Sequence, residues 1–430
     1  MTTTAEVWLW GTRIGYVHME AADQPATFEY DKNFLTSGIE VSPLQMPLSD
    51  RLYAFPELSG DAFHGVPGLL ADSLPDRFGN AVIDKWLVNT GRRPESFSAI
   101  ERLCYTGKRG MGALEYIPST GPTQNKAESV DVDALVKFAS EVLSDKEQLS
   151  VSAYDVSMEQ LLKLGTSAGG ARAKAIIAWN ESTDEIRSGQ VDAGNGFSYW
   201  LMKFDGVSGN GDRGLKDRPE YTLIEYAYHL MALDVGIAMN ECRIFEHHGL
   251  HHFMTKRFDR ENGGKKVHMQ TLAALAHIDY NLPCLCSYEQ LAYYARQIGC
   301  GMKEVEQIFR RMVFNVQAIN QDDHVKNFSF LMDRRGKWRL APAYDLTFAY
   351  SPRNRWLSAH QMTVNGKNKQ ITEQDLLAAG KQMKLSTKTC KSILEQTKKI
   401  VADWKQYAEK CGIREQTADN ILKIMKQENL

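Results

Sequence analysis

The segment from residue 305 to residue 345 constrains the fold more than any other part of the chain. Its first part carries apolar residues at the spacing of a buried helical stripe, namely Val305, Ile308, Phe309, Met312, Val313, Val316 and Ile319. A polar stretch, QDDHVKN at residues 321–327, follows, and the sequence NFSFLMDRRGKWRLAPAYDL then indicates a β-hairpin that ends near Asp345. The sequence therefore predicts a rigid helix end that delivers the chain to Asp322, with short connections on to Asp345.

The order of polar residues in this segment is the one that protein kinases use. Asn327 lies five residues after Asp322, and Asp345 follows one hairpin later. In kinases the first Asp orients the attacking hydroxyl, while the Asn and the later Asp hold magnesium against the nucleotide phosphates. Carboxylate and amide oxygens are hard ligands that suit Mg²⁺. A lone Asp-x4-Asn is also common by chance, and the stretch is then only the solvated end of a helix.

Three features upstream strengthen the kinase interpretation. The stretch GTSAGGARAK, residues 165–174, can supply backbone amides to phosphates because glycine permits close approach. Lys203 interrupts the apolar strand YWLMKFD, where a charge needs a partner, and Glu225 in the next helix can pair with it. Taken singly, these features also describe a tight hairpin, an edge lysine in water and a solvated glutamate. Their occurrence together in kinase order favours a nucleotide site.

Five motifs resemble those of the HipA family of toxin serine/threonine kinases: SAGGARAK, MKFDG, KRFDR, DDHVKN and PAYD. The pieces LLADSLPDRFG and MGALEY are similar to the family's first subdomain, so the resemblance spans nearly the whole chain. It implies an α+β, protein-kinase-like fold with two lobes, a strand-rich N-lobe and a helix-rich C-lobe, preceded by a mixed α/β subdomain. We expect that subdomain at residues 1–118, a linker or exposed loop at 119–131, the N-lobe with its glycine-rich phosphate loop at 132–260, and the C-lobe at 261–430.

The resemblance also implies a role for individual residues. Asp322 is expected to be the catalytic base, and Asn327 and Asp345 are expected to bind Mg²⁺. The residues expected to hold ATP are Ala168, Gly169, Gly170, Ala171, Lys203, Lys256, Phe258 and Lys326. Ser167 falls where the family has its inhibitory autophosphorylation serine, and a phosphate there adds about two negative charges to a loop that must receive ATP phosphates. Glu225 and His324 are expected to support the site structurally.

Partners and location follow from the same resemblance. It implies a helix-turn-helix antitoxin of HipB type, contact with operator DNA mainly through that antitoxin, and a protein substrate such as an aminoacyl-tRNA synthetase or another translation factor. The formal net charge of −2 excludes non-specific nucleic-acid binding as a global property. No apolar run approaches the ~18 residues of a membrane helix, and the N-terminus lacks the pattern of a secretory signal. The seven cysteines contain no CxxC pair, which favours a reduced, cytoplasmic protein.

Two other functions remain open at this stage. One is a metal-dependent phosphohydrolase that uses Asp322, Asp323 and His324 as ligands, and the other is a catalytically silent module of a repressor complex. The stretch HHGLHH, residues 247–252, suggests a metal site, but side chains alternate faces in a predicted hairpin, so we expect a solvated turn. The lysine-rich C-terminal helices carry interleaved apolar residues, which favours amphipathic surface helices over DNA contacts.

Overall fold

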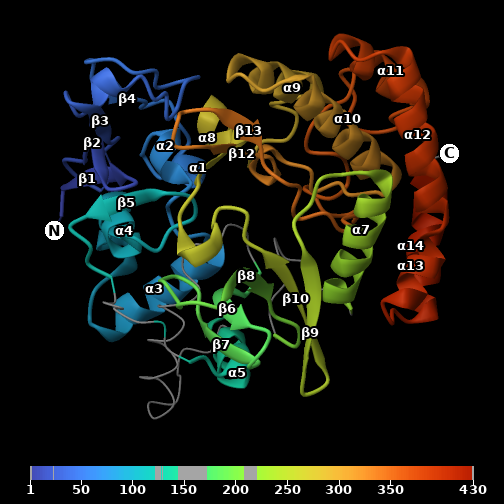
Figure 1. Cartoon of the computed structure of the whole chain (residues 1–430), viewed down its shortest axis with the longest axis horizontal. Helices are drawn as coiled ribbons and strands as arrows, with labels where there is room; N and C mark the ends of the chain where they lie inside the picture. Colours follow the sequence, from blue (N-terminus) through green and yellow to red (C-terminus); the bar gives the residue numbers. More distant parts are fainter. Residues whose placement is uncertain are drawn as a thin grey trace. The chain divides into compact units, whose positions relative to one another are not determined.

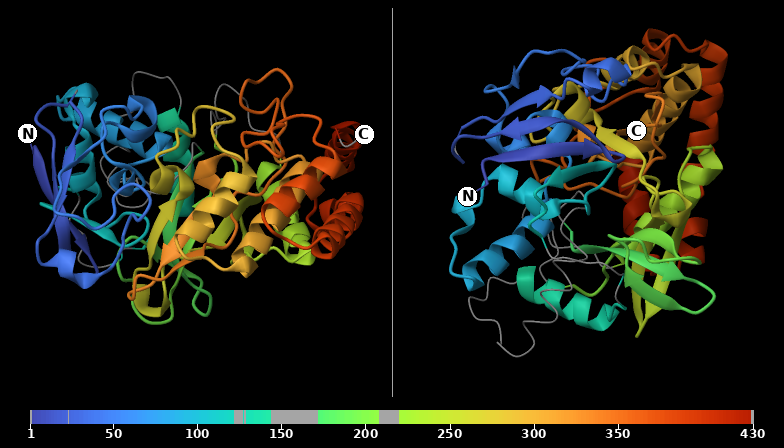
Figure 2. Two further views of the ribbon diagram at one scale, coloured as in Figure 1. Left: turned by 90° about the horizontal axis from the view of Figure 1, so that it is seen from above. Right: turned by 60° about the vertical axis from the view of Figure 1, so that its left-hand side comes forward.

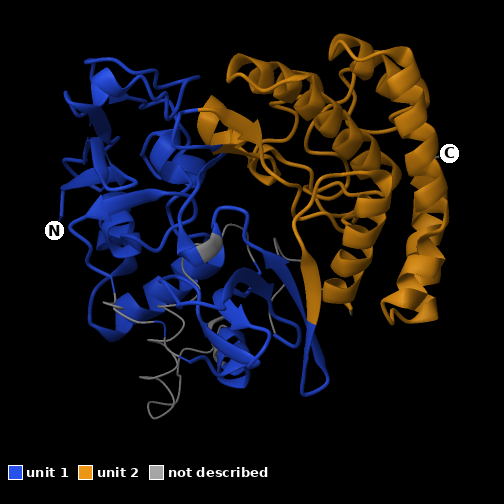
Figure 3. Ribbon diagram, viewed as in Figure 1, with its two compact units in different colours: residues 1–218, 245–270, 332–336 blue, residues 219–244, 271–331, 337–430 orange. Residues whose placement is uncertain are grey.

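The computed structural model describes residues 2–22, 24–121, 127, 129–143, 172–207 and 220–428 (Figure 1). The chain divides into two compact units (Figure 3). The first unit comprises residues 1–218, 245–270 and 332–336, and the second comprises residues 219–244, 271–331 and 337–430. Strands dominate the first unit and helices the second, which confirms the α+β expectation of a strand-rich and a helix-rich part.

The N-terminal part of the first unit is built on an antiparallel sheet of five strands in the order β4-β3-β2-β1-β5 (Figure 2). Its strands are β1 (Thr4–Leu9), β2 (Thr12–His18), β3 (Thr27–Tyr30), β4 (Tyr53–Ala54) and β5 (Leu114–Ile117). Trp10 and Gly11 join β1 to β2 with positive φ at both positions, the geometry of a two-residue hairpin turn. Between β3 and β5 lie η1 (Phe34–Ser37), α1 (Gly60–Phe63), α2 (Gly68–Ala71), α3 (Arg77–Asn89), η2 (Pro94–Ser96) and α4 (Ala99–Thr106).

A second sheet of five strands, in the order β7-β6-β8-β10-β9, carries Lys203 and Lys256, two of the residues expected to hold the nucleotide. Its strands are β6 (Lys174–Asn180), β7 (Glu185–Ser188), β8 (Ser198–Lys203), β9 (Cys242–His247) and β10 (Leu250–Lys256), and α5 (Val132–Leu143) precedes them. Phe78, Val82 and Ile83 of α3 share one buried cluster with Ile177 of β6 and Trp200 of β8. Helix α3 of the N-terminal part and this sheet therefore have a common core.

Helices form most of the second unit. They are α7 (Tyr221–Val235), α8 (Leu272–Ala276), α9 (Tyr288–Gln297), α10 (Met302–Gln317), α11 (Glu373–Gln382), α12 (Thr387–Ala402), α13 (Trp404–Lys410) and α14 (Glu415–Glu428). Strands β11 (His268–Thr271), β12 (Ser329–Met332) and β13 (Trp338–Leu340) form a sheet in that order, and β12 and β13 follow the polar loop along the chain. Short 3-10 turns lie at η3 (Asn262–Gly264) and η4 (Val325–Asn327).

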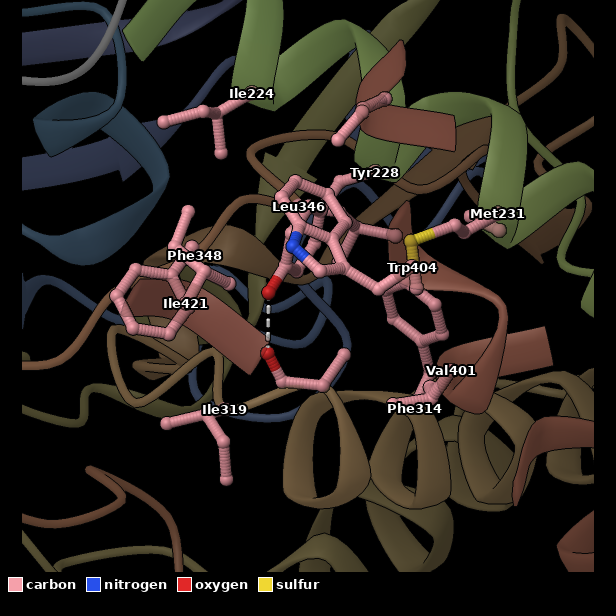
Figure 4. Packing of buried hydrophobic residues seen from close by; sticks show 14 of the residues in the cluster. Ile224, Tyr228, Met231, Phe314, Ile319, Leu346, Phe348, Val401, Trp404 and Ile421 are labelled. Carbon is pink, nitrogen blue, oxygen red and sulfur yellow. Dashed lines mark hydrogen bonds between the residues drawn. The ribbon is translucent and has the colours of Figure 1, made fainter. Parts of the chain in front are cut away.

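The apolar stripe predicted for residues 305–319 is buried at all seven positions, and six of them lie on α10, whereas Ile319 lies just beyond the end of that helix. Phe314, also on α10, packs in the core of the second unit with Tyr228 of α7 and the fully buried Trp404 of α13 (Figure 4). The Tyr228 hydroxyl donates a hydrogen bond to the main-chain oxygen of Ala318, directly after α10. The end of α10 is thereby fixed against α7. No helix within the described ranges is long and apolar enough to cross a membrane.

Candidate active site

The polar loop starts from a fixed helix end in the second unit. After α10, Ile319 adopts a left-handed backbone with φ 55°, which reverses the chain. The Asn320 amide still donates to the main-chain oxygen of Asn315 at 2.9 Å, and the Gln321 amide donates to that of Ala349 at 2.9 Å. Since both ends of this short connection are hydrogen-bonded, the position of Asp322 is set by backbone contacts.

A hydrogen bond between Asp322 and Asn327 joins the two ends of the loop. The Asn327 side-chain nitrogen Nδ2 donates to the main-chain oxygen of Asp322 at 2.8 Å, across η4. The Asp322 side chain is 35% exposed, and its Oδ1 lies 3.8 Å from Nε2 of His324. Because the loop uses the amide nitrogen of Asn327, the carbonyl oxygen Oδ1 is the atom with the capacity to bind a cation. The loop thus presents a carboxylate and an amide oxygen.

The segment around Asp345 returns to this loop. Tyr344 donates its hydroxyl to the main-chain oxygen of Lys326 at 2.7 Å, and Asn320 donates its side-chain nitrogen to the main-chain oxygen of Asp345 at 3.5 Å. Asp345 has a left-handed backbone with φ 52°, a conformation that costs a non-glycine residue free energy and that clusters at functional sites. The second unit therefore brings Asp322, Asn327 and Asp345 into one neighbourhood.

Asp323 is buried, unlike the partly exposed Asp322. It is 1% exposed, and its two oxygens accept three hydrogen bonds: from the Tyr288 hydroxyl at 2.7 Å, from Nδ1 of His360 at 2.9 Å and from the Gln361 amide at 2.7 Å. Asn315 of α10 donates to the same Tyr288 hydroxyl at 2.9 Å. Burial, with the Asp323 charge beside it, holds the pKa of Tyr288 well above its ordinary value. Sequence reasoning missed this network, which ties the loop to α9, α10 and residues 360–361.

His324 and Lys326 flank an aromatic side chain. The Tyr280 ring lies 5.9 Å from the His324 ring between centroids, and the Lys326 ammonium lies 4.6 Å from the Tyr280 centroid. Tyr280 and His324 also line a cleft with Leu282 and Leu285, two of the large exposed apolar residues. The roles expected for His324 and Lys326 stay predictions.

Lys203 and Lys256 lie in the second sheet of the first unit. Lys203 ends β8, which lies between β6 and β10, and is 9% exposed, so it is not an edge lysine pointing into water. Its ammonium is 5.8 Å from the Phe253 ring centroid. Lys256 ends β10 with its ammonium 5.6 Å from the ring of Trp200, and Phe258 is half-buried just beyond. Glu225 is 2% exposed in α7 of the second unit, and its pairing with Lys203 of the first unit stays a prediction.

The KRFDR stretch is held by a buried charge cluster. Asp259 is completely buried, and its carboxylate accepts hydrogen bonds from Arg257 and Arg260, with nitrogen–oxygen distances of 2.6–2.8 Å, and from the amide of Gly112 at 2.8 Å. Burial raises the pKa of Asp259, but the two guanidinium charges outweigh it, and the pKa lies well below its usual range. The arginines of this motif therefore fix the chain after β10. Ser167, Ala168, Gly169, Gly170 and Ala171 lie outside the described residues.

Family models cover both parts of the chain. The model of the HipA-like C-terminal domain matches residues 166–427, and that of the HipA N-terminal domain matches residues 5–117. The chain belongs to the HipA family.

Individual relatives of this HipA-family protein are distant. A putative kinase of Haemophilus influenzae is 28% identical over 159 residues, which is 33% of this chain and 46% of the relative, so the match spans about half of that protein's length. The HipA structure from Shewanella oneidensis MR-1, solved with HipB and operator DNA, aligns with a TM-score of 0.65 and 16% identity, covering 99% of this chain and 95% of that one. At this identity the likeness shows the fold, and it confirms the expected kinase-like architecture.

Two of the four histidines of HHGLHH lie together, which the alternation of side chains in a strand did not predict. His247 and His248 both contact the carboxylate of Asp133, at 3.3 and 2.9 Å, and their rings stack with centroids 4.2 Å apart. His248 has φ 48° and lies in the turn after β9, where the alternation of strand side chains no longer holds. His252 is buried elsewhere in this HipA-family fold, and its Nδ1 accepts the Asp205 amide at 3.0 Å.

The structure does not bring together the three metal ligands that the phosphohydrolase alternative requires. In the part of the chain that the structure describes, the cluster of Asp133 with the two histidines is the one group of three such side chains close enough to share a metal, and Asp133 and His248 are exposed. Asp323, which the alternative requires, has both oxygens occupied by buried donors. The loop of this HipA-family protein is therefore not a cluster of three metal ligands.

Proposed function

We propose that this chain is an ATP- and Mg²⁺-dependent protein serine/threonine kinase that acts as a toxin-type growth inhibitor. The observation that carries the proposal is the loop of the second unit. Asp322 faces outward from a hydrogen-bonded helix end, Asn327 closes the loop through its nitrogen, and the strained Asp345 packs against the same segment. Membership of the HipA family and the similarity to a protein described as a putative kinase support it.

Each residue has a role in this proposal. Asp322 accepts the hydroxyl proton of the substrate Ser or Thr and orients its oxygen toward the γ-phosphate. The carbonyl oxygen of Asn327 and the carboxylate of Asp345 fit Mg²⁺, which prefers oxygen ligands and, when bound, neutralises phosphate charge. Positioning dominates the rate of phosphoryl transfer, so the backbone contacts that fix the loop serve catalysis directly.

In this proposal the nucleotide contacts come from the glycine-rich stretch and from three lysines and a phenylalanine. Lys203 contacts the α- and β-phosphates, and the amides of residues 168–171 receive the phosphates. Lys256 and Phe258 are assigned to the adenine, and Lys326 is assigned to the γ-phosphate. Autophosphorylation at Ser167 would place a dianion where ATP phosphates bind, which is a physical route to self-inactivation.

The proposed partners follow the Shewanella protein, whose structure includes HipB and operator DNA. We propose a helix-turn-helix antitoxin of HipB type for this chain, with operator DNA contacted mainly through it. A cytoplasmic translation component such as an aminoacyl-tRNA synthetase is the proposed substrate.

The decisive experiment uses purified full-length protein with γ-labelled ATP. We expect Mg²⁺-dependent self-labelling, with the label at Ser167, and a loss of at least about 100-fold in Asp322→Asn, the contribution of a positioned general base. Asp333→Asn is the matched control, because Asp333 is an exposed carboxylate in the β12–β13 turn and its Oδ1 contact to the Arg335 amide survives in Asn. Wild-type protein that binds no ATP would overturn the proposal, and Mn²⁺-dependent phosphoester hydrolysis without ATP would instead support the hydrolase.

A further inference from the structure

A buried ion pair links helix α3 to the strand that follows the glycine-rich stretch. The Lys174 ammonium lies 2.9 Å from Oδ2 of Asp76, and each of the two side chains is 2% exposed. Lys174 is the first residue of β6, and Asp76 is the residue that caps the N-terminus of α3. An ion pair this deeply buried stays in place because breaking it leaves an uncompensated charge away from water.

The position of Asp76 is determined by the N-terminal part of the chain. Its other oxygen, Oδ1, accepts the Gly79 amide at 2.6 Å, as a helix N-cap does. The helix that it caps is fixed in turn, because Phe78, Val82 and Ile83 pack in the core shared with β6 and β8. The carboxylate that holds Lys174 is therefore attached to a rigid element.

Lys174 stands directly beside the proposed phosphate lysine. Lys174 and Lys203 are paired residues of the antiparallel strands β6 and β8, so their side chains leave the same face of the sheet. The Phe204 amide continues the pairing by donating to the Ala173 main-chain oxygen at 3.2 Å. Like charges placed directly opposite in a sheet repel one another. The ion pair with Asp76 holds the ammonium of Lys174 at the N-terminus of α3, and so fixes its position beside Lys203.

We propose that Asp76 is a positioning residue of the nucleotide site, acting through Lys174. Its carboxylate fixes the start of β6, directly after the glycine-rich stretch, and holds the Lys174 ammonium in place next to Lys203. The N-terminal part of the chain thereby contributes to ATP binding as well as to the fold. This inference rests on the proposed function, since it assigns Asp76 to the ATP site of that kinase.

The test is a double-mutant cycle in the full-length protein. Asp76→Asn keeps the side-chain oxygen that caps α3 and removes only the charge, Lys174→Met removes the ammonium, and the double variant removes both. Thermal unfolding, KM for ATP and kcat are measured for all three. We expect unfolding temperatures to fall in the single variants and to recover in the double variant, because a neutral buried pair has no unpaired charge. We expect KM for ATP to rise about tenfold in each of the three variants and kcat to change less than KM. The rise should be equal because the two residues act as one unit, so that losing either or both has the same effect.

Asp84→Asn is the matched control on the same helix. Asp84 pairs with Arg102 at 2.8 Å but is 40% exposed, so its loss should leave KM for ATP unchanged. In the double variant, both the KM for ATP and the unfolding temperature could return to their wild-type values. That result would show a purely structural role for the ion pair and would overturn the inference. An unchanged KM in folded Asp76→Asn would overturn it as well. Failure of the wild-type protein to bind ATP would refute the proposed function itself, whereas these outcomes leave that function standing.

Discussion

Removing the Tyr288 hydroxyl tests whether the Asp323 network holds the loop. Tyr288 is completely buried in α9, donates to Oδ2 of Asp323 at 2.7 Å and accepts from the Asn315 side chain at 2.9 Å. Tyr288→Phe keeps the ring, which packs edge-on against Phe328 with centroids 5.6 Å apart. The change therefore removes one oxygen atom and leaves the apolar packing in place.

The expected decrease in the free energy of unfolding follows from the two lost hydrogen bonds. A hydrogen bond to a charged group contributes about 1.5–3 kcal/mol, and a neutral one contributes about 1 kcal/mol. Tyr288→Phe should therefore lower the free energy of unfolding by about 3 kcal/mol. Asp323 keeps its contacts with His360 and Gln361, so the loop should remain near its place but open more often. A displacement of about an ångström at Asp322 should reduce phosphorylation by roughly tenfold to 100-fold.

Urea unfolding gives the stability change, and hydrogen exchange at residue 361 gives the local effect, because the Gln361 amide donates to Asp323. Tyr293→Phe is the matched control, since Tyr293 lies on the same helix and is 59% exposed. The network interpretation is refuted if Tyr288→Phe and Tyr293→Phe unfold at the same urea concentration and the residue 361 amide exchanges at its wild-type rate.

Two further predictions concern the first unit. Asp259→Asn leaves Arg257 and Arg260 buried without their carboxylate and should lower the free energy of unfolding by about 3–5 kcal/mol. A thermal unfolding temperature within about 2 °C of the wild-type value would contradict this prediction. Burial lowers the pKa of His252 to about 4 from its ordinary 6.5, so this neutral histidine contributes stability that is present above about pH 6.5 and is lost as pH falls toward 4, by up to about 3 kcal/mol. His252→Asn keeps an acceptor for the Asp205 amide and should flatten the loss of thermal stability between pH 7 and pH 4.5, whereas an unchanged slope would show that other groups cause it.

The parts of the site that depend on short sequence separation were predictable. The stripe from Val305 to Ile319 has a helical period, and all of it is buried. Asp322 and Asn327 are five residues apart, so a single turn suffices to join them, and the Asn327 side chain bonds the Asp322 backbone across it. The two-part strand-rich and helix-rich organisation followed from the same periodicities together with the family motifs.

The direction of a side chain in a loop was not predictable in the same way. Alternation in a strand led us to expect a solvated turn at residues 247–252 and no convergence of all four histidines. It did not predict that His248, in the turn with φ 48°, stacks on His247. A hairpin pattern gives the position of a turn only approximately, and one residue decides whether two side chains share a face. The ion pair between Asp76 and Lys174 was not predictable either, because the residues around each of them form no pattern that predicts a contact with the other.

Asp322 and Asp323 show most clearly what the sequence leaves open. They are adjacent and chemically identical, so composition and spacing cannot tell which one meets solvent. Packing decides it, because Tyr288 and His360, 35 and 37 residues away from Asp323, supply buried donors to that carboxylate alone. A carboxylate whose oxygens are saturated by buried donors cannot reach a substrate, whereas the 35% exposed side chain of Asp322 can. The inward residue holds the loop so that the outward one has a fixed position, and this division of roles requires both aspartates in sequence.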